Sequence, residues 1–256
     1  MFSTNLSKLI PSFLNFSKKL LVARWRSLVL LLIGVYLPLQ IFGLLAVEVW
    51  KNQGGFPWDV PILLAVHSTA QPQLDVIAVT LALFGKIEIV LPVVCVIALV
   101  LLIQKRWRSL TYLLTTEIGS AIINGTAKQF MHRVRPHLWE WESLVSEPSF
   151  SFPSAHSMAT MTLVAVLVIL TWGSVWCWVV SITGSLFVLG IAWTRLYLGV
   201  HFPSDILAGW MVSIGWAIGV SLIIRPHLTK DTIVSKTPPA EETTLLPEET
   251  QLIGEE

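Results

Sequence analysis

Long apolar runs separated by short polar segments are the main pattern of this sequence. Six runs are candidate membrane-spanning segments: residues 27–47, 87–103, 110–127, 157–172, 175–193 and 206–224. An α-helix rises about 1.5 Å per residue, so roughly 20 residues cross the hydrocarbon core, and the shorter runs need residues from their flanks. The runs lack the alternation of strands, and lipid tolerates no unpaired backbone polar groups. The pattern predicts an all-α fold, a polytopic membrane protein built as a bundle of six transmembrane helices.

A further segment, at 58–85, also carries a helical pattern. Its stretch PQLDVIAVTLALFG places Leu74, Ile77, Ala78 and Leu81 at helical spacing. We therefore expect an interfacial helical segment, of one or two helices, between spans 1 and 2.

The composition supports the membrane interpretation. Hydrophobic residues make up 54% of the chain and charged residues only 13%, whereas a soluble domain carries about a quarter charged residues. The net charge of +1 gives no indication of nucleic-acid binding. Cys95 and Cys177 both lie within apolar runs, where we expect small buried side chains rather than a disulfide.

Basic residues are distributed unevenly between the segments that connect the runs. The first 26 residues hold five basic residues and no acidic one, and further basic residues follow the second and sixth runs. Cytoplasmic segments of membrane proteins are enriched in Lys and Arg. We therefore expect both termini in the cytoplasm, in the plasma (inner) membrane, with 48–86, 128–153 and 194–203 outside. Four basic residues contradict this rule because they fall in the outer segments: Lys128, Arg133, Arg135 and Arg195.

The chain is expected to consist of three parts. Residues 1–26 form a basic amphipathic cytoplasmic segment, and no small-residue cleavage site follows the first run, which we expect to be an uncleaved span. Residues 27–225 form the membrane domain. Residues 226–256 hold six glutamates and are expected to be a disordered acidic cytoplasmic tail.

Three polar clusters lie at the ends of runs, all of them on the predicted outer side. They are KQFMHRVRP with Lys128 and Arg135, PSAH with Ser154, Ala155 and His156, and TRLYLGVHFPSD with Arg195, His201 and Asp205. Each has an ordinary interpretation by itself: a cation can anchor a span end, Pro-Ser can cap a helix, and a histidine can fill an interfacial position. Together, three cations, two histidines and a carboxylate are the groups that phosphoryl transfer without a metal requires.

A phosphate site gives each cation a role. A phosphomonoester carries about −1.5 to −2 charges near neutral pH, which Lys128, Arg135 and Arg195 can neutralise, and an arginine can hold two oxygens at once. The fourth span begins at Ser154 and presents free N–H groups, including that of Ala155, and its positive dipole end to an anion.

The two histidines indicate covalent catalysis. His201 can attack phosphorus, and Asp205, four residues on, can hold the other imidazole N–H and fix the tautomer. His156 can protonate the leaving alkoxide and then activate a water molecule. Glu117 and Asn124 share one helical face with Lys128, and we expect a supporting or packing role for Glu117.

These motifs resemble those of the type-2 phosphatidic acid phosphatase superfamily, lipid phosphatases whose active site is shared with the vanadium haloperoxidases. The matching patterns are Lys128-x6-Arg135-Pro136, Pro153-Ser154-Ala155-His156 and Arg195-x5-His201-x3-Asp205. The resemblance implies that His201 forms a phosphohistidine, that His156 is the acid and that Asp205 orients the nucleophile. It also implies that no metal or other cofactor is needed and that five residues bind phosphate: Lys128, Arg135, Ser154, Ala155 and Arg195.

Two positions depart from the family pattern. Ala155 stands where the family usually has Gly, and we expect its methyl group to crowd a backbone of positive φ. Thr194 stands where the third motif usually begins with Ser, and it keeps the hydroxyl. Neither change removes a catalytic group, so we expect an active enzyme.

The predicted function is that of a metal-independent membrane phosphatase that hydrolyses a lipid phosphate or diphosphate at the outer face. Phosphatidic acid, phosphatidylglycerol phosphate, polyprenyl diphosphates and sphingoid phosphates all stay open as substrates. Two alternatives also stay open: a lipid phosphotransferase that uses the same histidine, and a non-enzymatic transporter of anions or lipids. The expected partners are the substrate and membrane lipids, with no nucleic acid and no protein partner.

Overall fold

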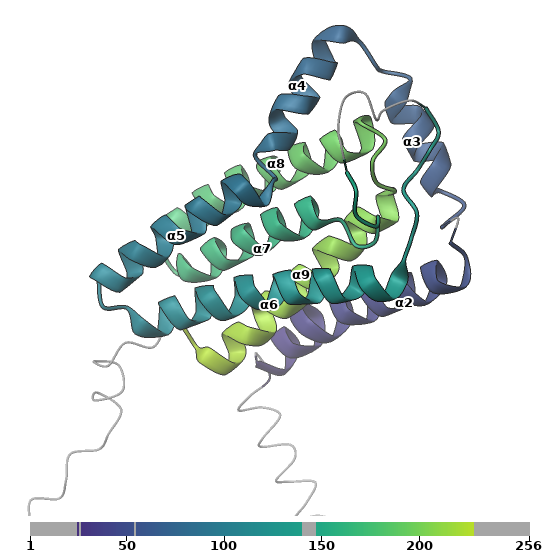
Figure 1. Ribbon diagram of the computed structural model, residues 1–256. Coiled ribbons are helices and arrows are strands. Elements are labelled where there is room, and N and C mark those ends of the chain that lie inside the picture. Colours follow the sequence, from purple (N-terminus) through teal and green to yellow (C-terminus); the bar gives the residue numbers. More distant parts are fainter. Residues whose placement is uncertain (1–24, 26, 54, 140–146, 228–256) are drawn as a thin grey trace, which may run out of the picture.

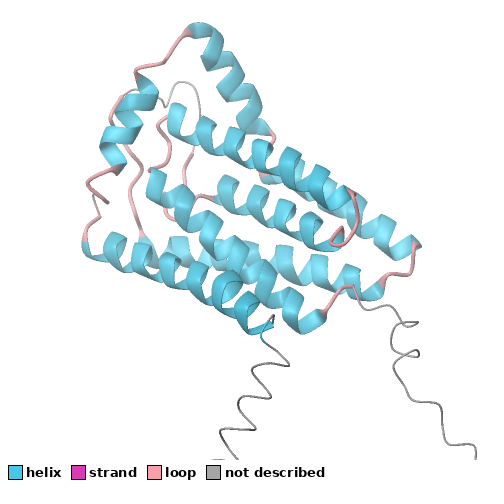
Figure 2. Ribbon diagram, turned by 180° about the vertical axis from the view of Figure 1, so that it is seen from behind, coloured by secondary structure: helices cyan, strands magenta, loops and turns pink. Residues whose placement is uncertain are grey.

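The regular elements of the protein are all helices in the part of the chain that the structure describes (Figures 1 and 2). The computed structural model describes residues 25, 27–53, 55–139 and 147–227. The predicted basic segment, apart from residue 25, and the predicted acidic tail beyond residue 227 lie outside the described residues. The expectation of an all-α fold is confirmed for the membrane domain.

The helices follow the predicted runs closely. In chain order they are a π-helical turn η1 (Leu32–Tyr36), α2 (Leu37–Lys51), α3 (Asp59–His67), α4 (Pro72–Leu83), α5 (Ile87–Ile103), α6 (Trp107–Met131), α7 (Ala155–Leu170), α8 (Trp176–Tyr197) and α9 (Pro203–Ile224). The segment predicted as one or two helices between the first two spans forms two, α3 and α4.

Helix α7 lies inside the bundle, with α6, α8 and α9 packed around it (Figure 1). An apolar core joins four helices through buried side chains of α5, α6, α7 and α9, among them Val90, Leu113, Val166 and Val220. Small residues allow the close contacts of α7: a Cβ added at Gly184 would lie 2.6 Å from Val164. The outward-facing side chains of the bundle are large and apolar, as expected of helices that contact lipid.

The number of membrane crossings is not set by the helices alone. Within the described part, the helix at 27–51, α8 and α9 are each long and apolar enough to cross, and α4 with α5 forms a pair bent by 43°. Helix α7 is apolar but has only 16 residues. The count of six spans and the interfacial position of α3 and α4 therefore stay predictions.

The loops that carry the three polar clusters lie together at one end of the bundle, beside α3 and α4 (Figure 1). The helix at 27–51 begins, and α9 ends, away from that end. The connections between α6 and α7 and between α8 and α9 thus meet at the same place.

Candidate active site

The structure brings the three predicted clusters together in one buried site. Lys128 is near the end of α6 and Arg195 near the end of α8, while His156 is in the first turn of α7. Ala155 is the first residue of α7, and the remaining members lie in the adjoining loops or in the first turn of α9. Seven of the eight predicted residues are at most 9% exposed: Lys128, Arg135, Ser154, His156, Arg195, His201 and Asp205.

The imidazole of His201 is oriented from both sides. Its Nε2 lies 3.0 Å from Nη1 of Arg135, and because a guanidinium can only donate, Nε2 must carry the lone pair. Its Nδ1 lies 3.4 Å from both Ser151 Oγ and Asp205 Oδ2. The ring is therefore the Nδ1–H tautomer, with its nucleophilic nitrogen directed toward the cations.

Electrostatics keep this imidazole neutral. Burial lowers the pKa of His201 well below its ordinary value, and the neighbouring Arg135, Arg195 and Lys128 lower it further. A neutral imidazole keeps the lone pair that an attack on phosphorus needs.

The carboxylate of Asp205 is fixed by the first turn of its own helix and by its neighbours. Its Oδ2 accepts the Phe202 N–H at 2.9 Å and a short hydrogen bond from the Ser151 hydroxyl. Its Oδ1 accepts from Nη1 of Arg133 at 2.5 Å. These three hydrogen bonds hold the carboxylate beside His201.

The cationic side chains line a pocket, and only some of their hydrogen-bond donors have acceptors among the described residues. Lys128 Nζ donates to Ser149 Oγ and to the Phe150 carbonyl, both at 2.8 Å. Arg135 donates through Nη1 to the Val200 carbonyl at 2.8 Å. Among the described residues, by contrast, Nε and Nη1 of Arg195 and Nε2 of His156 are buried without a hydrogen-bond partner. Buried donors without partners are costly, so the two Arg195 nitrogens, which can only donate, are available to bind an anion.

Glu147 lies between these donors and was not predicted from the sequence. Its Oε1 lies 2.7 Å from Nη2 of Arg195 and 4.0 Å from Nδ1 of His156, and its Oε2 lies 3.3 Å from Nη2 of Arg135. The carboxylate thus holds the position that the predicted phosphate needs.

The start of α7 forms the remaining side of the site. Ser154 has extended backbone, and its Oγ accepts the Ser157 N–H as the helix N-cap. Its own N–H donates to the Asp205 carbonyl at 3.2 Å, which ties α7 to α9. Asn124, which was expected to share a helical face with Lys128, donates to the Pro153 carbonyl at 3.2 Å.

The expected backbone strain at Ala155 is wrong. Ala155 is the first helical residue of α7, and the described non-glycine residues with positive φ are Lys105, His132 and Arg225. The extended Ser154 already makes the turn into the helix, so the next residue needs no left-handed conformation. The Thr194 hydroxyl, which replaces the usual serine, donates to the Ile191 carbonyl at 2.7 Å within its own helix.

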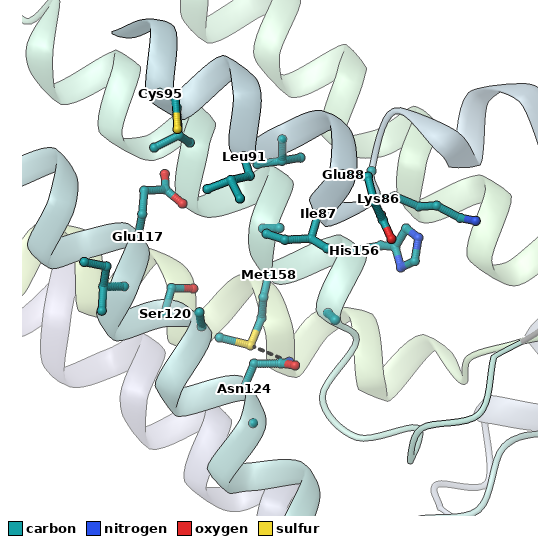
Figure 3. Close-up of a pocket in the computed structure, with 18 of the residues that line it drawn as sticks. Lys86, Ile87, Glu88, Leu91, Cys95, Glu117, Ser120, Asn124, His156 and Met158 are labelled. Carbon is teal, nitrogen blue, oxygen red and sulfur yellow. Dashed lines mark hydrogen bonds between the residues drawn. The ribbon is translucent and has the colours of Figure 1, made fainter. Parts of the chain in front are cut away.

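A cavity of about 650 Å³ leads from the site into the bundle between α5, α6 and α7. His156, Glu147 and Lys86 line one end of it, and most of the remaining lining is apolar. Figure 3 shows His156 and Lys86 at one end and Glu117 and Cys95 at the other. Oε1 of Glu117 has no hydrogen-bond partner among the described residues. A supporting role for Glu117 stays a prediction.

Arg133 and Asp59 also belong to the surroundings of the site, although sequence analysis gave neither a role. Arg133 was noticed only because it contradicted the charge rule for outer segments, and the structure explains the contradiction: it is fully buried and paired with two carboxylates. Asp59 gave no signal, because it comes from the segment predicted as interfacial and its partners Arg133 and Ser204 are more than 70 positions away.

Parts of the chain are similar to known proteins. Residues 109–228 match the model of the PAP2 superfamily. The chain is 27% identical over 199 residues to the undecaprenyl-diphosphatase of Sulfolobus acidocaldarius, covering 76% of this chain and 90% of that protein. It is 31% identical over 162 residues to phosphatidylglycerophosphatase B of Bacillus subtilis, covering 61% of this chain and 78% of that protein.

Two solved structures are similar in fold. The crystal structure of a transmembrane PAP2-type phosphatidylglycerolphosphate phosphatase from Bacillus subtilis superimposes with a TM-score of 0.65 at 26% identity, covering 76% of this chain and 98% of that chain. The crystal structure of Aquifex aeolicus LpxE superimposes with a TM-score of 0.54 at 23% identity, covering 64% and 95% respectively.

Proposed function

This chain belongs to the PAP2 superfamily, and from that premise we propose that it hydrolyses a lipid phosphate or diphosphate through a phosphohistidine on His201. The observation that carries the proposal is the orientation of the imidazole. Arg135 donates to its Nε2 at 3.0 Å, so the nucleophilic lone pair faces the cluster of cations that would bind phosphate.

The first half of the reaction forms the covalent intermediate. The substrate phosphate displaces Glu147 and binds Arg135, Arg195, Lys128 and the N–H groups at the start of α7. Nε2 of His201 attacks phosphorus, a P–N bond forms and the bond to the leaving oxygen breaks. His156 takes up a proton as the phosphate dianion of the substrate binds beside it, and it gives this proton to that oxygen, which leaves as a lipid alcohol or, from a diphosphate, as a lipid monophosphate.

The second half restores the enzyme. His156, now neutral, takes a proton from a water molecule, whose oxygen attacks phosphorus and breaks the P–N bond. Inorganic phosphate leaves, and His201 returns to the neutral Nδ1–H tautomer that Asp205 and Ser151 hold. Every charge that develops on the phosphoryl oxygens is met by side chains of this chain, which supports a metal-independent reaction.

A lipid substrate is supported by the cavity behind the site. The cavity of about 650 Å³ begins at His156, where the leaving group departs, and is lined mainly by apolar side chains of α5, α6 and α7. An acyl or polyprenyl chain fits such surroundings. The names of the two relatives indicate diphosphate and monoester lipid substrates, and both classes belong to the proposal.

The outer membrane face is proposed as the location of the site. The motif loops lie at the end of the bundle away from the first residues of the helix at 27–51 and the last residues of α9. Basic residues cluster before the helix at 27–51 and after α9. This distribution favours cytoplasmic termini in the plasma membrane.

The proposal is tested by phosphate release from the purified protein in the presence of EDTA. Phosphatidic acid, phosphatidylglycerol phosphate and a polyprenyl diphosphate form the substrate panel. We expect release with at least one of them, and a loss of about 10³-fold or more in His201→Ala, which removes the nucleophile. His227→Ala, an exposed histidine beyond α9, is the matched control and is expected to be fully active.

Four results would contradict the proposal or redirect it. Complete inhibition by EDTA would contradict the metal-independent site. Full activity of His201→Ala would exclude His201 as the nucleophile. Transfer of phosphate to an added lipid alcohol instead of water would assign a phosphotransferase, and tungstate binding without any turnover would favour a non-enzymatic anion or lipid transporter.

A further inference from the structure

Arg133 bridges two buried carboxylates beneath the site. Its Nη2 lies 2.9 Å from Oδ2 of Asp59, and its Nη1 lies 2.5 Å from Oδ1 of Asp205. All three side chains are fully buried. One cation between two carboxylates leaves a net charge of −1, and burying such a group is costly unless every member is paired. The bridge therefore needs a reason beyond anchoring a helix end.

Asp59 is itself fixed against the first turn of α9. Its Oδ1 accepts the Ser204 N–H at 2.9 Å, and its Oδ2 accepts the Ser204 hydroxyl at 2.6 Å. Oδ2 also accepts the Phe56 N–H at 3.0 Å. The carboxylate at the start of α3 thus sets the position of the residue that directly precedes Asp205.

The guanidinium of Arg133 is confined on several sides. Nη1 also donates to the Ser204 hydroxyl at 2.8 Å, and the guanidinium carbon lies 4.1 Å from the centre of the Phe202 ring. Gly55, with φ of +83°, leaves room for the head group: a Cβ added there would lie 1.8 Å from Nη2. A planar fork with two donor ends suits this position, and the single ammonium of a lysine does not.

This confinement has a direct effect on Asp205. Because Oδ1 is taken by Arg133, the carboxylate turns its Oδ2 toward Ser151 and the Phe202 N–H, and Oδ2 comes to lie 3.4 Å from Nδ1 of His201. Arg133 thus fixes the orientation of the carboxylate of Asp205, and this carboxylate selects the tautomer of His201.

We propose that Arg133 and Asp59 are positioning residues that act through Asp205. They hold the carboxylate at the angle that keeps the His201 imidazole in its Nδ1–H form, with Nε2 facing the phosphate. The proposal rests on the proposed function, since it takes His201 as the nucleophile. Neither residue touches the substrate, so both affect kcat and leave substrate binding nearly unchanged.

A double-mutant cycle with Asp205 tests this coupling. Arg133→Lys and Asp59→Asn should each lower kcat by about 10-fold to 100-fold and change KM by less than about threefold. In an Asp205→Asn background, each substitution should cost less than a further threefold or so, because the residue through which it acts is already lost. Asp75→Asn removes a carboxylate that accepts from Tyr197 at 2.7 Å outside the site, and this matched control should leave kcat unchanged.

A purely structural bridge predicts a different result. Each substitution would then lower kcat by the same factor in the wild-type and the Asp205→Asn backgrounds. The loss of kcat would also follow the fall in melting temperature of each variant. Equal losses, or full kcat in a folded Arg133→Lys protein, would overturn the proposal. If Arg133→Lys does not fold, Asp59→Asn, which keeps the shape of the side chain, completes the cycle alone.

A second readout needs no turnover. The ¹⁵N shifts of the His201 ring, identified by their loss in His201→Ala, should report the Nδ1–H tautomer in the wild type and a mixed population in Asp59→Asn and Arg133→Lys. If the wild type releases no phosphate but the tautomer still follows Arg133, the proposed function fails and the positioning role stands. If phosphate is released and the ring shifts are the same in all variants, the positioning role fails.

Discussion

Glu147 lies at the centre of the cation cluster, where the proposed mechanism places the phosphate. Its two oxygens contact Arg195 at 2.7 Å and Arg135 at 3.3 Å. A substrate must displace this carboxylate, and a phosphate dianion competes for two arginines better than the monoanionic phosphodiester of an ordinary phospholipid does.

Glu147→Gln should therefore strengthen the binding of inorganic phosphate. Removal of the competing charge is expected to lower the dissociation constant by about 10-fold, a difference of about 1.4 kcal/mol. Binding can be measured by calorimetry on the purified protein. Glu88→Gln is the matched control, because Glu88 lines the same cavity but makes no ion pair with a described residue. Weaker binding in Glu147→Gln would show instead that the carboxylate holds the arginines in place for the substrate.

Residues with chemistry of their own were predictable from the sequence, and residues that act through neighbours were not. His201 and Asp205 stand four positions apart, and that spacing alone implies a carboxylate beside an imidazole at a helix start. Arg133 and Asp59 are 74 positions apart and meet only because α3 and the loop after α6 both reach α9. No local pattern encodes such a meeting.

At the scale of elements, α5, α6 and α7 shape the cavity behind the site. Gly125 of α6 lines it, and a Cβ added there has no heavy atom within 4 Å. A leucine at this position therefore enters the cavity without straining the helices around it. Gly43 of α2 has equally open surroundings away from the cavity.

Gly125→Leu is expected to discriminate between substrates by chain length. The added side chain takes space from a lipid tail, so kcat/KM for a long-chain substrate should fall by about 10-fold or more. Release of phosphate from a short-chain, water-soluble ester should be unchanged, as should both activities in Gly43→Leu. An equal loss with both substrates in Gly125→Leu would mean that the tail binds elsewhere.

Helix limits were predictable where the apolar run and the helix end together. The run at 87–103 lies between Lys86 and Gln104, and α5 has the same limits. The run before Arg195 was expected to end at Trp193, but α8 continues to Tyr197. The guanidinium of Arg195 faces the site and contacts Glu147, whereas the Thr194 hydroxyl bonds within its own helix. The change of polarity therefore marked the start of the site rather than the end of the helix.

At the scale of the whole molecule, the motif loops lie at one end of the bundle, which we call the reactive end. The helix at 27–51 begins and α9 ends at the opposite end. Ser68, in the loop between α3 and α4, is exposed at the reactive end, and Ser174, between α7 and α8, is exposed at the opposite end. Cys95 and Cys177 can be replaced by alanine to give a background without thiols.

In that background, a membrane-impermeant maleimide should label Ser68→Cys in intact cells and should label Ser174→Cys only after the membrane is opened. The expectation follows from the excess of basic residues before the first span and after the last, which favours cytoplasmic termini. The reverse pattern of labelling would place the site on the cytoplasmic face. It would leave the chemistry of the site unaffected.

The covalent step is tested most directly by trapping the intermediate. The purified protein is mixed with a lipid substrate labelled with ³²P at the terminal phosphate, quenched with alkali within milliseconds and digested. A P–N bond is stable to alkali and labile to acid, so the account predicts label on the peptide that contains His201, released by acid and absent in His201→Ala. Phosphate release at the normal rate with no label on that peptide at any time would contradict the phosphohistidine mechanism.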